Sequence, residues 1–222
     1  MHILNTYWFE ETTPSTPGTA DVFTTGTSYV DTDTTPAVSV SPAGQYYENN
    51  VTHLVVLASE IGYGTKIIES IDIWQCRSGS FTGDPDYNAD NAEWWLAHTN
   101  EFNCNSSMKS DFSHSQSTFN SSDRIKVRNR ANISKLNNAG WQTINFDTDF
   151  NYDGTSNLVF SFYTDSTTFW AGPYRCAFGW GSKGTSRAVT YGSDSGTAPQ
   201  NNAYSMNTKV TRFPLLKINY LS

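Results

Sequence analysis

Residues 141–163 read "WQTINFDTDFNYDGTSNLVFSFY", and this stretch carries the clearest structural pattern in the chain. Apolar and polar side chains alternate on both sides of the Asp153-Gly154 pair. The apolar positions that keep the alternation are Ile144, Phe146, Leu158, Phe160 and Phe162. Because side chains in a strand point to opposite faces in turn, the pattern predicts two strands. Asp and Gly between them predict a tight connection, since Asp caps turns with its own side chain and Gly adopts positive φ.

The same stretch also matches part of a calcium loop. Asp149, Asn151, Asp153 and Gly154 fall at the first, third, fifth and sixth places of such a loop. The twelfth place, where the loop needs a bidentate Glu, is Phe160, and the flanks show strand alternation instead of helices. We therefore interpret the acidic residues as part of a connection and Phe160 as a core residue.

The rest of the chain repeats this pattern of short strands. Runs of β-branched and aromatic residues alternate with clusters of Gly, Asn, Asp, Ser and Pro, and no helical period is sustained. The length of 222 residues suits one large β domain. We predict an all-β fold, a single antiparallel β-sandwich of the jelly-roll-like kind over 21–222. Strands are expected at 53–58, 66–74, 124–133, 141–146, 157–163 and 214–221, while 91–99 could be a strand or a short helical turn.

The first 20 residues form an arm and a linker. The apolar residues of the arm are Ile3, Leu4, Tyr7, Trp8 and Phe9. They precede "EETTPSTPGTAD", a stretch rich in Thr and Pro that is typical of a linker. The arm can be a first strand that folds back onto its own sheet. Alternatively, it can complete the open sheet edge of a neighbouring copy.

Charge limits the class of partner. The net charge is −7 and the pI is about 4.9, which argues against nucleic-acid and anionic-membrane binding. No apolar run is long enough to span a bilayer. Low charge with about a quarter Ser and Thr is common on exported surfaces. The first ten residues do not form a secretory signal, so we expect either a removed leader or another route of release, such as a virus particle.

The strand expected at 124–133 divides its residues between two faces. Its basic face consists of Arg124, Lys126, Arg128 and Arg130. Its apolar face consists of Ile125, Val127, Ala131 and Ile133. The basic stripe can protect a solvated strand against edge-to-edge aggregation. It can also contact an anionic partner, and in an acidic protein another copy of the chain is such a partner.

The sequence shows no catalytic or cofactor motif. His spacing does not match HExxH, and there is no GxSxG, Walker or GxGxxG motif, so we expect a protein that is not an enzyme and has no cofactor. Calcium is the one metal the sequence suggests. The oxygen ligands would be Asp84, Asp86, Asn88 and Asp90. Their alternate spacing suits Ca²⁺, but the glycine at the sixth place is missing and Trp95 stands where Glu is needed.

Aromatic residues suggest a second kind of ligand. The faces of tryptophan rings pack against pyranose rings, and the exposed candidates are Trp94, Trp95 and Trp180. Four Asn-X-Ser/Thr sequences could carry glycans, and they begin at Asn50, Asn105, Asn120 and Asn132. Three widely spaced cysteines allow one disulfide with one thiol, or three reduced thiols.

Four segments together carry a family resemblance. They are "VFTTGTSYVDTDTTP", "LVVLASEIGYGTKIIESIDI", "WWLAHTNEF" and "GWQTINFDTDFNYDGTSNLVFSF". Their content and order resemble a jelly-roll-like β-sandwich domain of secreted and cell-surface proteins of Bacteroidetes and related bacteria. The resemblance covers about residues 23–221, and the chain departs from it by standing alone, by its arm and by an insertion around 77–93. It implies a β-sandwich, an extracellular setting and no catalytic residues.

These observations favour a structural protein. We expect a subunit that assembles with copies of itself into a filament, a fibre or a surface layer, with the arm as a donated strand. The alternatives are a carbohydrate-binding or adhesion module that uses the three tryptophans, and a virion decoration or tail-fibre protein. A polysaccharide is then a further partner, and neither nucleic acid nor membrane insertion is expected.

Overall fold

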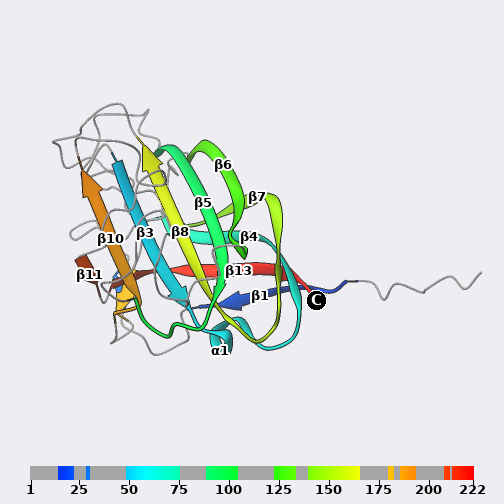
Figure 1. Cartoon of the computed structure of the whole chain (residues 1–222). Coiled ribbons are helices and arrows are strands. Elements are labelled where there is room, and N and C mark those ends of the chain that lie inside the picture. Colours follow the sequence, from blue (N-terminus) through cyan, green and yellow to red (C-terminus); the bar gives the residue numbers. More distant parts are fainter. Residues whose placement is uncertain are drawn as a thin grey trace, which may run out of the picture.

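The computed structural model of the chain describes residues 15–22, 29–30, 49–75, 89–104, 123–133, 140–165, 180–182, 186–193, 208–210 and 212–222. These residues form an antiparallel β-sandwich, as predicted. Within them, no helix has the length and hydropathy that crossing a bilayer requires. Figure 1 shows the two main sheets packed face to face, with their strands crossing at a large angle.

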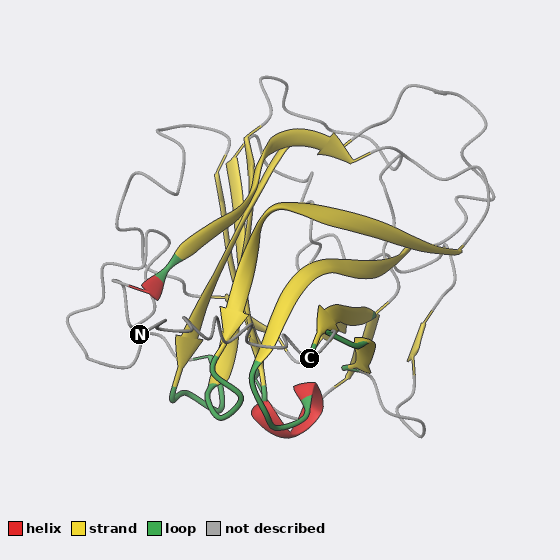
Figure 2. Cartoon of the chain, turned by 90° about the vertical axis from the view of Figure 1, so that its right-hand side faces the viewer, coloured by secondary structure: helices red, strands yellow, loops and turns green. Residues whose placement is uncertain are grey.

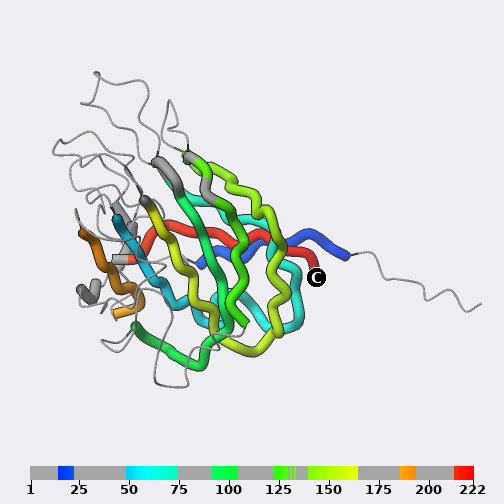
Figure 3. The backbone as a smooth tube through the Cα atoms, turned by 45° about the horizontal axis from the view of Figure 1, so that its top comes forward, coloured from blue at the N-terminus to red at the C-terminus, as the bar shows by residue number. Residues whose placement is uncertain are grey.

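The smaller main sheet has four strands in the order β1-β13-β4-β7. Their bounds are Pro17–Asp21 for β1, Leu216–Leu221 for β13, Lys66–Gln75 for β4 and Gly140–Tyr152 for β7. The first and the last of the described strands are therefore neighbours, with Pro17 opposite Leu221. Figure 3 shows β1 in blue running beside β13 in red.

The larger sheet has six strands in the order β11-β10-β3-β8-β5-β6. Their bounds are Thr208–Val210, Ala188–Ser193, Asn49–Val56, Asn157–Asp165, Ala89–Thr99 and Ile125–Ile133, in that order. A small third sheet joins β12 (Arg212–Pro214), β9 (Trp180–Ser182) and β2 (Tyr29–Val30). Short helix α1 (Ala58–Ile61) follows β3 at one end of the sandwich, where Figure 2 shows it in red.

The chain passes repeatedly from one sheet to the other. The connections β3 to β4, β4 to β5, β6 to β7 and β7 to β8 all change sheet. Most pairs of neighbouring strands are therefore not consecutive in sequence, as in jelly-roll folds, and the exceptions are β5 with β6 and β10 with β11. The Asp153-Gly154 connection between β7 and β8 is one of these crossings and is not a hairpin within one sheet.

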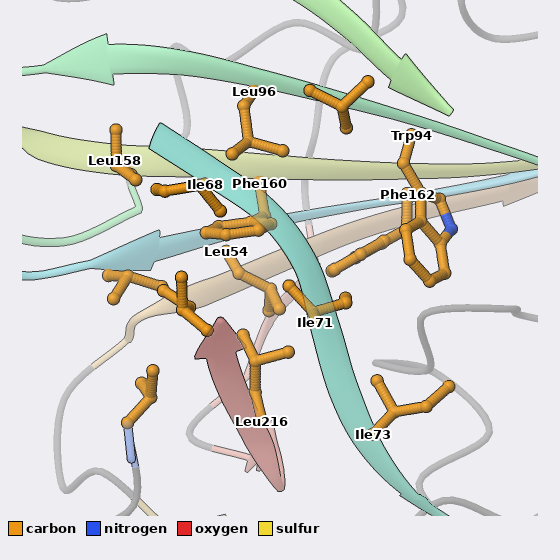
Figure 4. Packing of buried hydrophobic residues seen from close by; sticks show 14 of the residues in the cluster. Leu54, Ile68, Ile71, Ile73, Trp94, Leu96, Leu158, Phe160, Phe162 and Leu216 are labelled. Atoms are coloured by element: carbon orange, nitrogen blue, oxygen red, sulfur yellow. The ribbon is translucent and has the colours of Figure 1, made fainter. Parts of the chain in front are cut away.

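The core lies between the two sheets. Residues of the six-stranded sheet face residues of β4 and β13 across it, as Figure 4 shows for Phe160, Leu96, Ile71 and Leu216, all of them fully buried. Trp94 and Phe162 pack edge to face with their ring centroids 5.2 Å apart. Burial of each such side chain contributes about 1.5–3 kcal/mol, so this layer is the main source of stability.

Most expected strands are confirmed, one open alternative is resolved and two bounds are corrected. The segment 91–99, which could have been a helical turn, lies in strand β5. The linker was expected to run to residue 20, but Pro17–Asp21 is strand β1, because Pro is tolerated as the first residue of an edge strand. The strand expected to reach residue 58 gives way to α1, where the side chain of Glu60 accepts a hydrogen bond from the Leu57 amide at 2.9 Å.

The predicted faces of β6 are only partly confirmed. Val127 and Ile133 are buried in the core, but 37% of Ile125 is exposed and Ala131 is exposed. The register between β5 and β6 shifts at three places between Ala89 and Trp95. Two of the four residues of the predicted apolar face are therefore buried, and the other two are exposed on this edge strand.

Candidate functional site

Two glycine turns interlock at the α1 end of the sandwich. Gly64 lies after α1 with φ 93°, and Gly154 lies between β7 and β8 with φ 83°. The Gly64 amide donates to the Gly154 carbonyl oxygen at 3.2 Å. A Cβ on Gly154 would lie 2.4 Å from the carbonyl carbon of Gly64. Both turns therefore need glycine, and Gly154 needs it for space as well as for φ.

Lys66 holds the first of these turns. Its ammonium group donates to the carbonyl oxygens of Gly62, Tyr63 and Gly64 at 2.8, 2.7 and 3.1 Å. The same nitrogen lies 5.0 Å from the ring centroid of Tyr220. Only 8% of the residue is exposed, and burial lowers the pKa of the lysine. Three carbonyl oxygens and an aromatic face replace the water that the ammonium group loses.

Asp153 closes the second turn. One carboxylate oxygen accepts hydrogen bonds from the amides of Thr155 and Ser156 at 2.8 Å each, and the other accepts from the Ser156 hydroxyl at 2.6 Å. Burial alone would raise the pKa of Asp153, but these hydrogen bonds and His98 outweigh it and lower the pKa to about 2. The acidic residue caps a turn, as predicted, and Phe160 is fully buried in the core.

His98 joins β5 to two other segments. Its Nδ1 is in contact with the Asp123 carboxylate, and its Nε2 accepts a hydrogen bond from the Asp153 amide at 3.1 Å. Because Nε2 accepts from a backbone amide, Nδ1 is the ring nitrogen that faces the Asp123 carboxylate. The ring stacks on Tyr152 with centroids 5.9 Å apart. This Asp–His pair resembles part of a catalytic triad. It has no ring nitrogen left to act as a base, because a backbone amide occupies Nε2.

A buried ion pair completes this end of the molecule. Arg187 donates to both carboxylate oxygens of Glu60 and, through Nε, to the Val55 carbonyl oxygen at 2.7 Å. Asn157 accepts from the Ala58 amide at 2.8 Å and donates to the Glu101 carbonyl oxygen at 2.9 Å. The residues of the quoted motifs thus meet at one end of the sandwich, where they satisfy each other's hydrogen bonds.

The side chains of the four predicted metal ligands lie outside the described residues. Asp84, Asp86 and Asn88 precede strand β5. Asp90 is the second residue of β5, but its side chain is not described. Among the residues that the structure describes, no group of His, Cys, Asp or Glu is arranged to hold a metal ion.

The basic stripe is divided and packed on tryptophans. Arg124 lies 3.9 Å above the centroid of the Trp95 ring, and Lys126 forms an ion pair with Glu93 at 3.3 Å. Arg128 lies 5.4 Å from the centroid of Trp94, and burial, opposed by nearby Asp147, lowers its pKa. The side chain of Arg130 lies outside the described residues. The prediction of one continuous stripe was therefore wrong, because the register shifts of β6 turn these residues apart.

Of the predicted glycan contacts, one is corrected. Trp94 is fully buried between the sheets, so it cannot stack on a sugar. Trp95 lies on the opposite face, where Arg124 and Lys126 approach its ring and its N–H donates to Glu93 at 2.6 Å. The side chain of Trp180 lies outside the described residues.

The predicted glycosylation positions and the cysteines are placed only in part. Asn50 is 3% exposed, so it cannot carry a glycan in this fold. Asn105, Asn120 and the side chain of Asn132 lie outside the described residues, as do Cys76 and Cys176. Cys104 is a buried thiol whose Sγ lies 3.6 Å from the His53 carbonyl oxygen.

Strand β1 forms one edge of the four-stranded sheet. Thr16 and Ser222 exchange two backbone hydrogen bonds of 2.9 and 3.1 Å, which sets the alternation along the pair. In an antiparallel pair only every second residue bonds to the partner strand. The backbone groups of Pro17, Thr19 and Asp21 therefore point to the outer side, where no described strand pairs with β1. Residues 1–14 of the arm lie outside the described residues.

The outer face of the four-stranded sheet carries two polar rows that cross all four strands. One row contains Thr19, Asn219, Ser70 and Asn145, and the next contains Asp21, Lys217, Asp72 and Thr143. Asn219 donates to Ser70 at 3.1 Å and to Asp72 at 3.0 Å. Thr19 and Thr143 extend this network at its two ends, with bonds of 2.9 and 2.7 Å. These side chains hold each other in fixed positions.

A pair of tryptophans adjoins the polar rows. Trp74 on β4 is directly opposite Trp141 on β7, and their rings are edge to face with centroids 5.5 Å apart. Trp141 is 37% exposed, and the Lys217 ammonium lies 4.2 Å from its ring centroid. The buried indole N–H of Trp74 has no hydrogen-bond partner among the described residues. We call the two polar rows and this pair the outer platform.

The outer platform was not predicted from the sequence. A signal was present in "WQTINF", where Ile144 is buried. Trp141, Thr143 and Asn145 occupy the alternate positions, so they lie together on the outward face of the strand. Comparisons with family models, curated proteins and solved structures gave no match.

Proposed function

We propose that the chain is a non-catalytic extracellular structural protein that assembles into a filament, a fibre or a surface layer by donating its N-terminal strand to a neighbouring copy. The observation that carries this proposal is the position of β1. It is an edge strand that pairs with the final strand, so both ends of the described chain meet at one corner. Residue 15, where the described part of the chain begins, therefore lies at this corner.

The arm has the composition that strand donation requires. Its apolar residues are Ile3, Leu4, Tyr7, Trp8 and Phe9. A strand advances about 3.3 Å per residue, so 14 residues can extend about 46 Å, which is enough to reach an adjacent molecule. Donated strands gain backbone hydrogen bonds along a sheet edge and bury alternate side chains. A contact of this kind is head to tail, and it propagates into a filament when its rotation does not close a ring.

The polar network at the α1 end supports the absence of catalysis. His98, Asp153, Glu60 and Lys66 all have protein partners that use their hydrogen-bonding atoms. The basic residues Arg124 and Lys126 are likewise engaged with Trp95 and Glu93, so the proposal depends on the arm and not on the basic stripe.

Electron microscopy and gel filtration of two chains test the proposal. The full chain should form ordered polymers, and a chain that lacks residues 1–12 should be monomeric because the donated strand is gone. A matched pair of point variants separates the effect of the arm's sequence from the effect of its length. Leu4→Asp should prevent assembly, whereas Thr13→Asp, in the Thr/Pro stretch, should leave it intact. Polymers of normal appearance from the truncated chain would show that the arm is not donated.

A further inference from the structure

The outer platform combines one exposed indole with a floor of polar side chains. From this combination we infer a second role: the outer platform binds a neutral polysaccharide, with Trp141 as the stacking residue and the adjacent polar row as the source of hydrogen bonds. This role differs from strand donation, since it uses side chains on a sheet face and not the backbone of an edge.

Trp141 has the properties of a stacking residue. It is 37% exposed although its strand is paired with β4, so part of its ring is open to a ligand. The Lys217 ammonium lies 4.2 Å from the ring centroid and covers part of the ring, so this long side chain must move aside when a sugar stacks there. The negative face of an aromatic ring attracts positive charge, and the C–H groups of a pyranose carry partial positive charge. Trp74, edge to face at 5.5 Å, fixes the orientation of the ring.

The polar floor offers hydrogen bonds in a fixed array. Asp72 accepts from Thr143 and Asn219, and these bonds hold all three side chains in place before a ligand arrives. Neighbouring strands are about 4.8 Å apart, and outward residues on one strand repeat every ~6.8 Å. A sugar chain that lies across the strands would meet polar groups at short, regular intervals. Because the array is already ordered, little conformational entropy is lost on binding.

The charges favour a neutral ligand. One row places Lys217 between Asp21 and Asp72, so acidic groups outnumber basic ones there. The whole chain has a net charge of −7. An anionic polysaccharide would be repelled, whereas the hydroxyl groups of a neutral sugar can donate to carboxylates.

The distribution of apolar groups favours a sugar over a protein partner. Protein interfaces have a continuous apolar centre with a polar rim. Here the order is reversed, because the exposed Ile67 lies at one end of the face and the tryptophan pair lies at the other, with the two polar rows between them. A single aromatic contact flanked by hydrogen-bonding groups suits one sugar residue and its neighbours.

Affinity gel electrophoresis tests this inference with named probes. The full chain is run through gels that contain β-1,3-glucan, hydroxyethylcellulose, xylan or galactomannan, and through polygalacturonate as the anionic comparison. Retardation is expected in at least one neutral gel and not in polygalacturonate. Trp141→Ala should weaken binding roughly tenfold or more, and Trp141→Phe should retain a large part of it. Thermal unfolding of each variant confirms that it is folded.

Two matched controls make the result decisive. Phe102 is 67% exposed and lies outside the outer platform, so Phe102→Ala removes an exposed ring and should leave binding unchanged. Deletion of residues 1–12 should also leave binding unchanged, which keeps a failure of the assembly proposal separate from a failure of this one. The inference is overturned if the full chain is retarded by none of the neutral polysaccharides, if it is retarded only by polygalacturonate, or if Trp141→Ala binds as the unaltered chain does.

Discussion

Gly154 stands at the closest backbone contact between the two interlocked turns, and its replacement by alanine gives the sharpest test of the fold. Its φ of 83° costs an alanine about 1–2 kcal/mol. The new Cβ would also lie 2.4 Å from the Gly64 carbonyl carbon and 2.6 Å from the Thr65 nitrogen. These are backbone atoms that cannot rotate away, and overpacking of this kind costs about 1–3 kcal/mol. The free energy of unfolding should therefore fall by about 2–5 kcal/mol.

Two other glycines separate strain from steric overlap. Gly64 has φ 93° but nothing within 4 Å of an added Cβ, so Gly64→Ala should cost only the strain, about 1–2 kcal/mol. Gly140 has open space around an added Cβ and no positive φ, so Gly140→Ala should change stability by less than about 0.5 kcal/mol. For a chain of this size, Gly154→Ala should lower Tm by about 10 °C.

Urea unfolding followed by tryptophan fluorescence measures the three variants against the unaltered chain. The expected order of loss is Gly154→Ala, then Gly64→Ala, then Gly140→Ala. Equal losses for the first two variants would refute the interlocked turns, because the clash with Gly64 would then contribute nothing.

Two further predictions concern charges at the same end of the sandwich. Glu60→Ala leaves Arg187 buried and without its carboxylate, so it should cost about 3–5 kcal/mol in urea unfolding, and the double variant Glu60→Leu, Arg187→Met should recover much of this loss. The pKa of Asp153 is about 2, below its ordinary 3.8, so its ionised form stabilises the fold above about pH 4, and this contribution is lost as the pH falls through 2. The shift corresponds to about 2.4 kcal/mol, which solvent screening of a side chain that is 41% exposed reduces to about 1 kcal/mol. Asp153→Asn should therefore lose about 1 kcal/mol at pH 7 and match the unaltered chain near pH 2, and an equal loss at both pH values would contradict the predicted ionisation effect.

The strands could be predicted from sequence because each one carries its own period. In "TINF" and "NLVFSF" the apolar residues of one face recur at every second position, and Phe160 and Ile144 are buried as that pattern requires. The sheet to which each strand belongs is not encoded in this local period. Strands β7 and β8 are joined by four residues but lie in different sheets, and only contacts distant in sequence decide this.

The candidate sites could be predicted only where the alternation is undisturbed. Trp94 and Trp95 are adjacent, so one of them had to face the core, but their own period could not say which one. The register shifts of β5 and β6 then divided the basic residues. The ion pair of Glu60 and Arg187 joins residues 127 positions apart, and local spacing gives no sign of such a partner.

Binding of the isolated arm to the rest of the chain tests strand donation directly. A fluorescent peptide of residues 1–14 is titrated with the chain that lacks those residues, which retains β1, and its anisotropy is measured. Strand donation predicts saturable binding of one peptide per chain, and it predicts that a peptide with Leu4→Asp and Trp8→Asp does not bind. No saturation, or equal binding of the two peptides, would contradict the proposal that this protein assembles through its N-terminal strand.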